Sequence, residues 1–382
     1  WRISRSVAGR LFFFFFYGDF RLMIAATIQD PRLFSEEAVL DGCYKALLLD
    51  HLAHVAHSHM IVVDEDGVIG RALISAIASL PVGVRKRAEA AVSTNRVIRL
   101  APDAVRRQQY ESTGIDVGTA ITLALNQLSI DAVISDEDGK VCAALIDGDP
   151  PARVFTLPEY LSSPTHDRLL CTMGAVSTGG MARVDFGASI VGPVLRWAKS
   201  PRVIDRYITT ALYENNPSDD PNLDNQWNRV RETIRYMYDV WNRTSVVNKD
   251  FFKIVTKPYL KGWGNRPWHY GACPSLEQQA ERLANELDLG KFARIEFIKV
   301  PRELWDIEHD RYLVTDNEFI LSFSRGFDLI RPGGILLESS VSLYHPGSQS
   351  FVLSMLLRAE VLATCSLIES VWATEVKRGK YR

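Results

Sequence analysis

Short apolar runs alternate with longer mixed stretches in the first part of this chain, from Met23 to about Leu161. Strands of a parallel sheet are buried on both faces and return through helical crossovers, so this alternation is typical of that architecture. The run His59–Val63 is predicted to be a buried strand, and Ile69–Leu80 an amphipathic helix that ends before Pro81. The sequence therefore predicts an α/β fold.

The second half of the chain predicts another set of helices and strands. Trp227–Trp241 and Leu276–Leu289 have helical periodicity, whereas Phe251–Thr256 and Arg294–Val300 have the composition of strands. Tyr312–Ser324 is predicted to form a hairpin that turns at Asp316-Asn317. We expect these elements to form a mixed sheet flanked by helices.

Two domains are expected from the length of 382 residues. We assign residues 23–162 to the first domain and 201–382 to the second, with a linker richer in Gly, Ser and Thr at 163–200. Residues 1–22 contain the run Phe12–Phe16 between arginines. They are interpreted as translated upstream sequence, so that the natural start is Met23; a signal peptide is the alternative.

Composition narrows the class of protein but not its partners. The chain is 47% hydrophobic and 24% charged, which is typical of a folded globular protein, and its net charge of −2 gives no overall attraction to nucleic acid. The five cysteines include no CxxC pair, which favours reduced thiols and a cytoplasmic location. No segment resembles a membrane span, which needs roughly 18 to 20 apolar residues.

The most specific motif lies near the C-terminal end. His309, Arg311 and Asp316 have the spacing of the phospholipase D signature HxKxxxxD, with Arg in place of Lys. Side chains alternate along a strand, so His309 and Arg311 are predicted to lie on one face, where both can contact one phosphate. The segment Ser322–Asp328, which contains Arg325 and Gly326, follows closely.

This motif resembles the C-terminal phospholipase-D-like domain of the MIT-domain proteins of cytokinesis. The segments Val203–Ile208 and Ile254–Thr256 are similar to that family's opening strands, and the resemblance covers roughly Pro201 to Gln349. It implies a module that binds acidic phospholipid headgroups without cleaving them. The phosphate-binding residues that it implies here are Asp205, Arg206, Arg311, Asp316 and Arg325.

Catalysis at this motif is a separate alternative. Phospholipase D chemistry needs two histidines, one that attacks phosphorus and one that protonates the leaving group. His269 and His345 have no Lys or Arg two residues later, so His309 is the one catalytic candidate. A symmetric homodimer would bring two copies of His309 together. A structural role for the His309–Arg311 strand end is also left open.

Acidic residues follow the predicted strands of the first domain. Asp64 follows Ile61–Val63, Asp136 and Asp138 follow Ala132–Ser135, and Asp116 begins a predicted helix. The carboxyl ends of neighbouring parallel strands meet at one crevice, where carboxylates can bind Mg²⁺ or Mn²⁺ and activate water. Exposed turns rich in Asp and Gly explain the same residues equally well.

The order of these acidic residues resembles a PIN-type nuclease domain. The resemblance implies metal ligands at Asp64, Asp116, Asp136 and Asp138, and catalytic roles for Asp116 and Asp136. The usual Asp-Thr-Asn after the first strand is replaced by Asp64-Glu65-Asp66, which leaves the first ligand open. Asp30 and Glu36 or Glu37 are further candidates.

Two weaker clusters have alternative explanations. His51, His54, His57 and His59 could bind zinc, but no HExxH pattern is present, and a partly solvated helix face is the simpler interpretation. The loop from Lys257 to Tyr270 combines aromatic and basic residues, as in surfaces that bind single strands, yet its glycines fit an ordinary loop equally well.

Three functional hypotheses follow. The first is a phosphate- or nucleic-acid-binding protein whose PIN-like domain is a metal-dependent nuclease effector. The second is a non-catalytic module that binds a phosphorylated headgroup or a nucleotide. The third is a dimeric phosphodiesterase that depends on His309.

Overall fold

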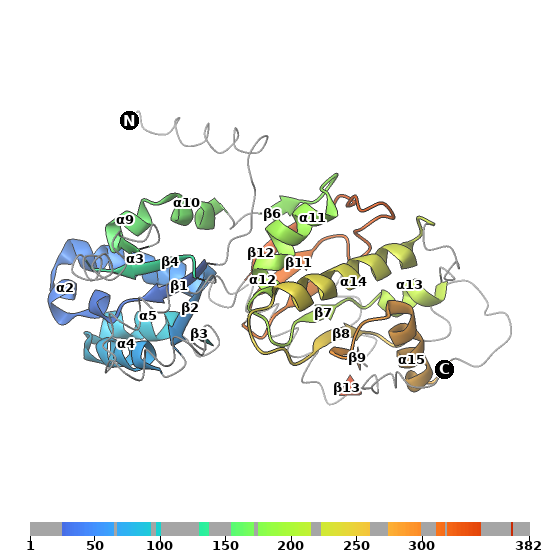
Figure 1. The fold of residues 1–382 in the computed structure, drawn as a ribbon, viewed down its shortest axis with the longest axis horizontal. Coiled ribbons are helices and arrows are strands. Elements are labelled where there is room, and N and C mark those ends of the chain that lie inside the picture. Colours follow the sequence, from blue (N-terminus) through green and yellow to red (C-terminus); the bar gives the residue numbers. More distant parts are fainter. Residues whose placement is uncertain are drawn as a thin grey trace, which may run out of the picture.

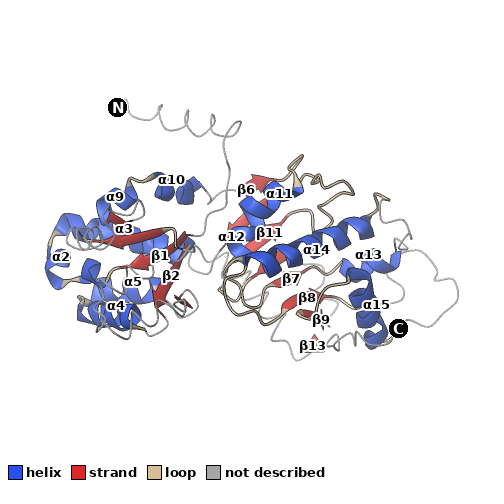
Figure 2. Cartoon of the chain, in the orientation of Figure 1, coloured by secondary structure: helices blue, strands red, loops and turns tan. Residues whose placement is uncertain are grey.

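A computed structural model describes residues 25–64, 67–92, 97–100, 130–136, 154–171, 175–214, 223–259, 274–298, 311–317, 319–344 and 368–369. It confirms the predicted α/β fold, in which the strands form two sheets and the helices pack against them (Figures 1 and 2). Within these ranges, no helix is both long and apolar enough to span a membrane.

The first sheet is parallel throughout. Its strands are ordered β3-β2-β1-β4-β5, with β1 in the centre. Their bounds are Ala25–Gln29 for β1, His59–Asp64 for β2, Val97–Leu100 for β3, Ala132–Ser135 for β4 and Val154–Thr156 for β5. Because the strands are parallel, β1, β2 and β4 all end at the same edge, which we call the acidic edge.

Helices enclose this first sheet. They are η1 (Pro31–Phe34), α2 (Glu36–Leu40), α3 (Gly42–Ser58), α4 (Val68–Ser79), α5 (Val82–Ala91), α9 (Leu157–Leu161) and α10 (Pro164–Cys171). The predicted helix before Pro81 corresponds to α4, which starts after Gly67 in a left-handed conformation with φ of 74°. Glycine has no Cβ and adopts that conformation readily, so the turn between β2 and α4 can be tight.

The second sheet is mixed and has eight strands in the order β13-β9-β8-β7-β10-β11-β12-β6. The strands β7, β8 and β9 are parallel, and the other pairings are antiparallel. The bounds are Ala175–Ser177 for β6, Arg202–Ile204 for β7, Phe252–Thr256 for β8, Ala293–Ile298 for β9, Arg311–Val314 for β10, Ile320–Phe323 for β11, Ser340–Tyr344 for β12 and Ile368–Glu369 for β13.

Helices pack on one face of the second sheet, and α14 runs across it (Figure 1). They are α11 (Arg183–Phe186), the π-helical turn η3 (Gly187–Val191), α12 (Gly192–Leu195), α13 (Ile208–Glu214), α14 (Gln226–Thr244) and α15 (Leu276–Leu287). Both long helices have side-chain caps: Asn225 accepts a hydrogen bond at the start of α14, and Ser275 forms a capping box with Gln278 at the start of α15.

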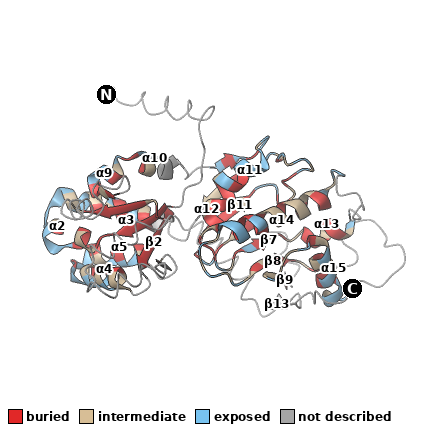
Figure 3. Cartoon of the chain, in the orientation of Figure 1, coloured by how far each residue is buried: buried red, intermediate tan, exposed pale blue. Residues whose placement is uncertain are grey.

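Alternation along the central strands separates two faces. Val203, Ile254 and Leu313 belong to the large core beneath the helices, whereas Ile204 and Tyr312 belong to a small cluster on the opposite face. Figure 3 shows the sheets as the most buried parts of the chain. A residue one step beyond the pair Ile204–Tyr312 therefore lies on the helix-covered face.

The described residues of the segment expected to be a linker, 163–171 and 175–200, form folded structure. The strand β6 pairs with β12, and Thr178 donates a hydrogen bond of 2.7 Å to the carbonyl of Leu337. α10 packs against α9 of the first domain. Its Gly, Ser and Thr content suggested a linker, but the edge strand β6 satisfies backbone groups by pairing with a strand far along the sequence.

Candidate functional sites

One edge of the second sheet gathers residues from several strands. The parallel strands β7 and β8 end there, antiparallel β10 begins there, and β11 ends there. This edge, which we call the Arg311 edge, therefore brings Asp205 and Arg311 together, although 105 residues lie between them in the sequence. The loop from Ser324 to Gly326 follows β11 at the same edge.

Asp205 is the buried centre of the Arg311 edge. Its side chain is 5% exposed, and its carboxylate accepts hydrogen bonds from the backbone N–H groups of Tyr207, at 2.8 Å, and Phe327, at 3.4 Å. Nε of Arg311 lies 3.7 Å from Oδ1 of Asp205. Burial raises the pKa of Asp205, and the positive charge of Arg311 opposes that rise. The ion pair thus offsets part of the cost of burying this carboxylate.

Two guanidinium groups lie over the ring of Tyr207. The Cζ atom of Arg206 is 4.6 Å from the ring centroid, and that of Arg311 is 5.0 Å from it. Arg206 also donates a hydrogen bond to the hydroxyl of Tyr207. Cations are attracted to the electron-rich face of an aromatic ring, so Tyr207 contacts both guanidinium groups. A guanidinium group can donate two parallel hydrogen bonds to the oxygens of a phosphate.

Gly326 packs directly against this pair. Its φ is +114°, and a Cβ atom built there would lie 3.0 Å from Nε of Arg311. Only a glycine backbone adopts this conformation without strain and also leaves the guanidinium in place. The glycine of the Arg325-Gly326 segment is thus explained by the position of Arg311.

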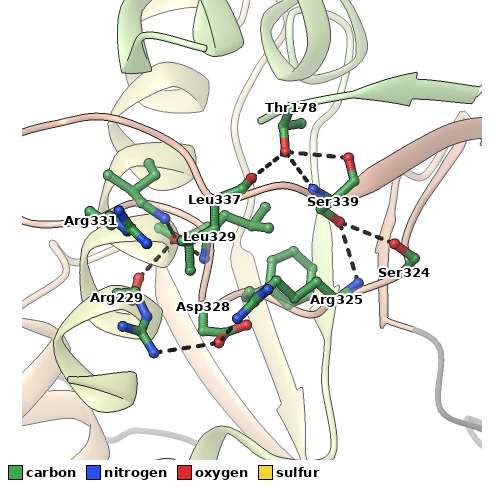
Figure 4. Close-up of polar contacts among 12 residues, drawn as sticks. Thr178, Arg229, Ser324, Arg325, Asp328, Leu329, Arg331, Leu337 and Ser339 are labelled. Carbon is green, nitrogen blue, oxygen red and sulfur yellow. Dashed lines mark hydrogen bonds and ion pairs between the residues drawn. The ribbon is translucent and has the colours of Figure 1, made fainter. Parts of the chain in front are cut away.

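Figure 4 shows Asp328, two residues after Gly326, with its ion-pair partners Arg325 and Arg229. Asp328 lies 3.8 Å from Nε of Arg325 and 3.9 Å from Nη2 of Arg229, and burial raises the pKa of Asp328. The backbone N–H of Arg325 donates a hydrogen bond of 3.3 Å to Ser339. Arg325 is 46% exposed, so its guanidinium can reach a ligand from the rim of the edge.

Asp316 lies away from this group. Its carboxylate accepts hydrogen bonds from the backbone N–H groups of Lys199, at 2.8 Å, and Ser200, at 3.0 Å. It follows β10 at the end opposite to Arg311, about 16 Å away for five residues of extended strand. We therefore correct the expectation that Asp316 shares a phosphate with Arg311. His309 and Asp310 lie outside the described residues.

The acidic edge of the first sheet brings together Asp30, Ser135 and Asp136. Asp30 follows the central strand β1, and its carboxylate accepts a hydrogen bond of 2.5 Å from the hydroxyl of Ser135. Arg32 lies between the carboxylates: its Nη2 is 3.0 Å from Asp30, and its Nε is 3.7 Å from Asp136. Burial raises the pKa of the nearby Tyr44, and both carboxylates add to that rise.

A divalent ion fits these carboxylates only if Arg32 withdraws. In the part of the chain that the structure describes, no group of three or more metal-binding side chains has the geometry of a metal site. Asp116 and Asp138 lie outside the described residues, as does the side chain of Asp64 at the end of β2. Of the four metal ligands predicted from the sequence, the structure therefore describes the side chain of Asp136 alone, and Asp30 lies beside it at this edge.

Histidines from α3, β2 and α10 form a buried cluster. His51 contacts Gln29 through Nε2 at 2.8 Å, His59 contacts the hydroxyl of Tyr160 at 2.6 Å, and His166 contacts His54 at 3.4 Å. His59 uses both ring nitrogens in hydrogen bonds, whereas Nδ1 of His51 and Nδ1 of His166 are buried without a partner among the described residues. A zinc site is not formed by the described members of the quartet, and the side chain of His57 lies outside the described residues.

Sequence reasoning gave no role to Tyr207 or Gly326, and it placed Asp30 among secondary candidates. Asp30 follows a buried run, Ala25–Gln29, which is the signal that could have identified it. Tyr207 stands between Arg206 and Ile208 in a segment already matched to a family element. Its role depends on Arg311, which no local pattern reveals.

Comparison with known proteins does not assign this chain to a family. No protein-family model matches the sequence, and a search of curated proteins found no significant match.

Proposed function

We propose that this protein binds a phosphate group at the Arg311 edge and is a phosphate- or nucleic-acid-binding protein with a phospholipase-D-like domain. The observation that carries the proposal is the pair of guanidinium groups, from Arg206 and Arg311, on the ring of Tyr207. Guanidinium groups pair readily with phosphate oxygens, and a bound anion would offset the positive charge that these two arginines bring to the same tyrosine.

The network around the pair supports binding. Asp205 orients Arg311 through their ion pair, and Gly326 leaves room for the guanidinium. Arg325 adds a half-exposed cation whose partner Asp328 lies 3.8 Å away, a distance at which a phosphate can compete for it. A rigid inner pair and an adaptable outer arginine are the arrangement expected of a site that binds an anion from solvent.

Binding is tested with a labelled single-stranded oligonucleotide and with inorganic phosphate as competitor, at a fixed salt concentration. Arg311→Ala and Arg206→Ala are expected to weaken binding about 10- to 100-fold, the value of a charge-assisted hydrogen bond. The control is Arg196→Ala, which removes an arginine from the ring of Trp197, 5.0 Å away, and should leave binding unchanged. Equal affinities in all three variants would contradict the proposal.

Turnover distinguishes binding from catalysis. We infer a binding module, because the roles given to Arg206, Arg311 and Asp205 require no chemical step. Hydrolysis of a phosphodiester that survives chelation and disappears in His309→Ala would instead assign a phosphodiesterase, active as a homodimer. Size-exclusion chromatography with light scattering measures that oligomeric state.

A second candidate function is supported by the acidic edge. Asp30 and Asp136 follow neighbouring parallel strands, and Ser135 orients Asp30, an arrangement in keeping with a PIN-like nuclease that uses Mg²⁺ or Mn²⁺. Metal-dependent cleavage of RNA or DNA that is lost in Asp136→Ala and in Asp116→Ala supports this function. Cleavage that persists in both variants would exclude it.

A further inference from the structure

A buried hydroxyl at the Arg311 edge has no hydrogen-bond partner among the residues that the structure describes. Thr256 is the last residue of β8 and is only 1% exposed. In the described part of the chain, its Oγ1 neither donates nor accepts a hydrogen bond. Buried polar groups are nearly always hydrogen-bonded, because an unpaired one has lost its water without replacement. Such an exception calls for a ligand or a water molecule.

The sheet register places Thr256 beside Asp205. Ile204 of β7 pairs with Val255 of β8, and the backbone N–H of Asp205 donates a hydrogen bond of 3.0 Å to the carbonyl of Val255. Thr256, Asp205 and Arg311 therefore form the next row across three neighbouring strands, on the helix-covered face. Strands are about 4.8 Å apart, so Thr256 and Arg311 flank Asp205 from either side.

Arg311 also has an unused donor. Its Nε is buried, and among the described residues it makes no hydrogen bond, since Asp205 lies at 3.7 Å, beyond hydrogen-bonding distance. Two donors on opposite sides of Asp205 are thus buried without a hydrogen-bond partner among the described residues. The more exposed Arg325 lies at the rim, with 46% of its side chain accessible against 17% for Arg311.

We propose that the Arg311 edge receives a terminal phosphate group, a phosphomonoester, and that Thr256 donates a hydrogen bond to one of its oxygens. This proposal rests on the phosphate binding proposed above. A monoester presents three free oxygens and carries its substituent on one side, so it can enter a recess with its oxygens first. A diester within a chain carries substituents on two sides, which keep its phosphorus at the surface.

Ligand chemistry is tested by titration calorimetry on the full chain. Thymidine 5′-phosphate and glycerol 3-phosphate are the monoesters, and a thymidine dinucleotide with hydroxyl ends is the diester. Both monoesters, or one of them, should bind at least about tenfold more tightly than the diester. Whichever monoester binds more tightly identifies a nucleotide or a lipid headgroup as the source. Equal binding of diester and monoesters overturns the terminal-phosphate proposal and leaves phosphate binding intact, whereas no binding of any probe overturns both.

The role of Thr256 is tested with two variants. Thr256→Val removes the hydroxyl at constant shape and should weaken monoester binding about fivefold to tenfold, while Thr256→Ser should bind like the parent protein. A hydroxyl without a partner contributes nothing to the free protein, so the melting temperature of Thr256→Val without ligand should be unchanged or higher. A lower melting temperature, or unchanged monoester affinity, would assign Thr256 a structural role and reject the proposal.

Discussion

The guanidinium of Arg32 lies 3.0 Å from the carboxylate of Asp30, and its Nε lies 3.7 Å from Asp136. One side chain therefore joins the ends of two neighbouring strands, β1 and β4. The side chain of Asp30 is only 1% exposed, and this arginine and the hydroxyl of Ser135 provide its carboxylate with polar partners in place of water. A cation already occupies the position that the acidic edge offers to a metal.

Arg32→Gln should therefore make the first domain sensitive to metal. Without the guanidinium, the buried Asp30 and its neighbour Asp136 repel each other, and we expect the free energy of unfolding to fall by about 1–3 kcal/mol in EDTA. Mn²⁺ or Mg²⁺ should recover part of this loss by binding the freed carboxylates. Urea denaturation followed by circular dichroism, with and without metal, measures both effects.

The matched control for Arg32→Gln is Arg85→Gln. Arg85 forms an exposed pair of 3.8 Å with Glu89 on α5, and such pairs contribute about 0–1 kcal/mol. The free energy of unfolding of this variant should hardly fall and should not respond to metal. If both variants behave alike, the guanidinium of Arg32 does not hold the acidic edge together.

The sequence predicted β2 and β4 of the first sheet but missed its central strand, β1. β2 and its terminal Asp64 were recognised, whereas the central strand β1 was not, because it contains the polar residues Thr27 and Gln29. Both are buried, and Gln29 is satisfied by hydrogen bonds to Thr27 and to His51, a partner that lies 22 residues away. Such partners are set by the tertiary structure, so local periodicity could not identify β1.

The site in the second domain was also predicted only in part. The grouping of Arg311 with Asp205, Arg206 and Arg325 was predicted from motifs in the correct order along the chain. Asp316 was placed with them although an extended strand carries it to the opposite edge. Spacing within a motif does not distinguish a ligand-binding carboxylate from one that caps backbone N–H groups.

Gly326→Ala should disturb the Arg311 edge more than a comparable substitution elsewhere. Gly326 and Gly333 both have a positive φ, of +114° and +95°, but a Cβ at Gly333 meets nothing within 4 Å. Both alanine variants carry a backbone strain, whereas only the Cβ at position 326 contacts Arg311. We expect Gly326→Ala to lower the free energy of unfolding by about 1–2 kcal/mol more than Gly333→Ala, as measured by denaturant titration.

Loss of phosphate affinity should accompany that difference. Displacement of Arg311 by the new methyl group affects binding directly, while Gly333 lies outside the edge. An equal effect of the two substitutions on stability and on binding would show that Gly326 serves only the turn.

Asp205 and Arg311 should be energetically coupled. Arg311→Gln leaves a buried carboxylate without its cation, and Asp205→Asn leaves the guanidinium without its anion, so each is expected to cost about 3–5 kcal/mol. The double variant should cost less than the sum, which a double-mutant cycle measures. Because burial already raises the pKa of Asp205, Arg311→Gln should regain stability as the pH falls and the carboxyl takes up a proton. Additive costs would contradict a direct interaction.

Acid should unfold the first domain before the second. Burial lowers the pKa of His51, and the neighbouring His59, His54 and His166 add to that effect. The pKa of His166 is likewise lowered by burial and by His54, against the opposing charges of Asp167 and Asp50. The folded state therefore favours neutral rings, whereas the unfolded chain protonates near its ordinary pKa of about 6.5. Stability present above that pH should be lost as the pH falls below it.

For His51, this loss approaches about 1.4 kcal/mol per pH unit, and His51→Gln should remove that part of the pH dependence. The measurement can separate the domains, because no tryptophan lies between Met23 and residue 196. Trp227 and Trp241 are buried in the second domain, and Trp197, just before that domain in the sequence, is buried as well. Between pH 7 and pH 5, far-ultraviolet circular dichroism should therefore show the first domain melting at progressively lower temperature, while the tryptophan fluorescence transition changes little. Parallel shifts of the two signals, or an unaltered pH dependence in His51→Gln, would show that the buried histidines do not set the acid stability of the first domain.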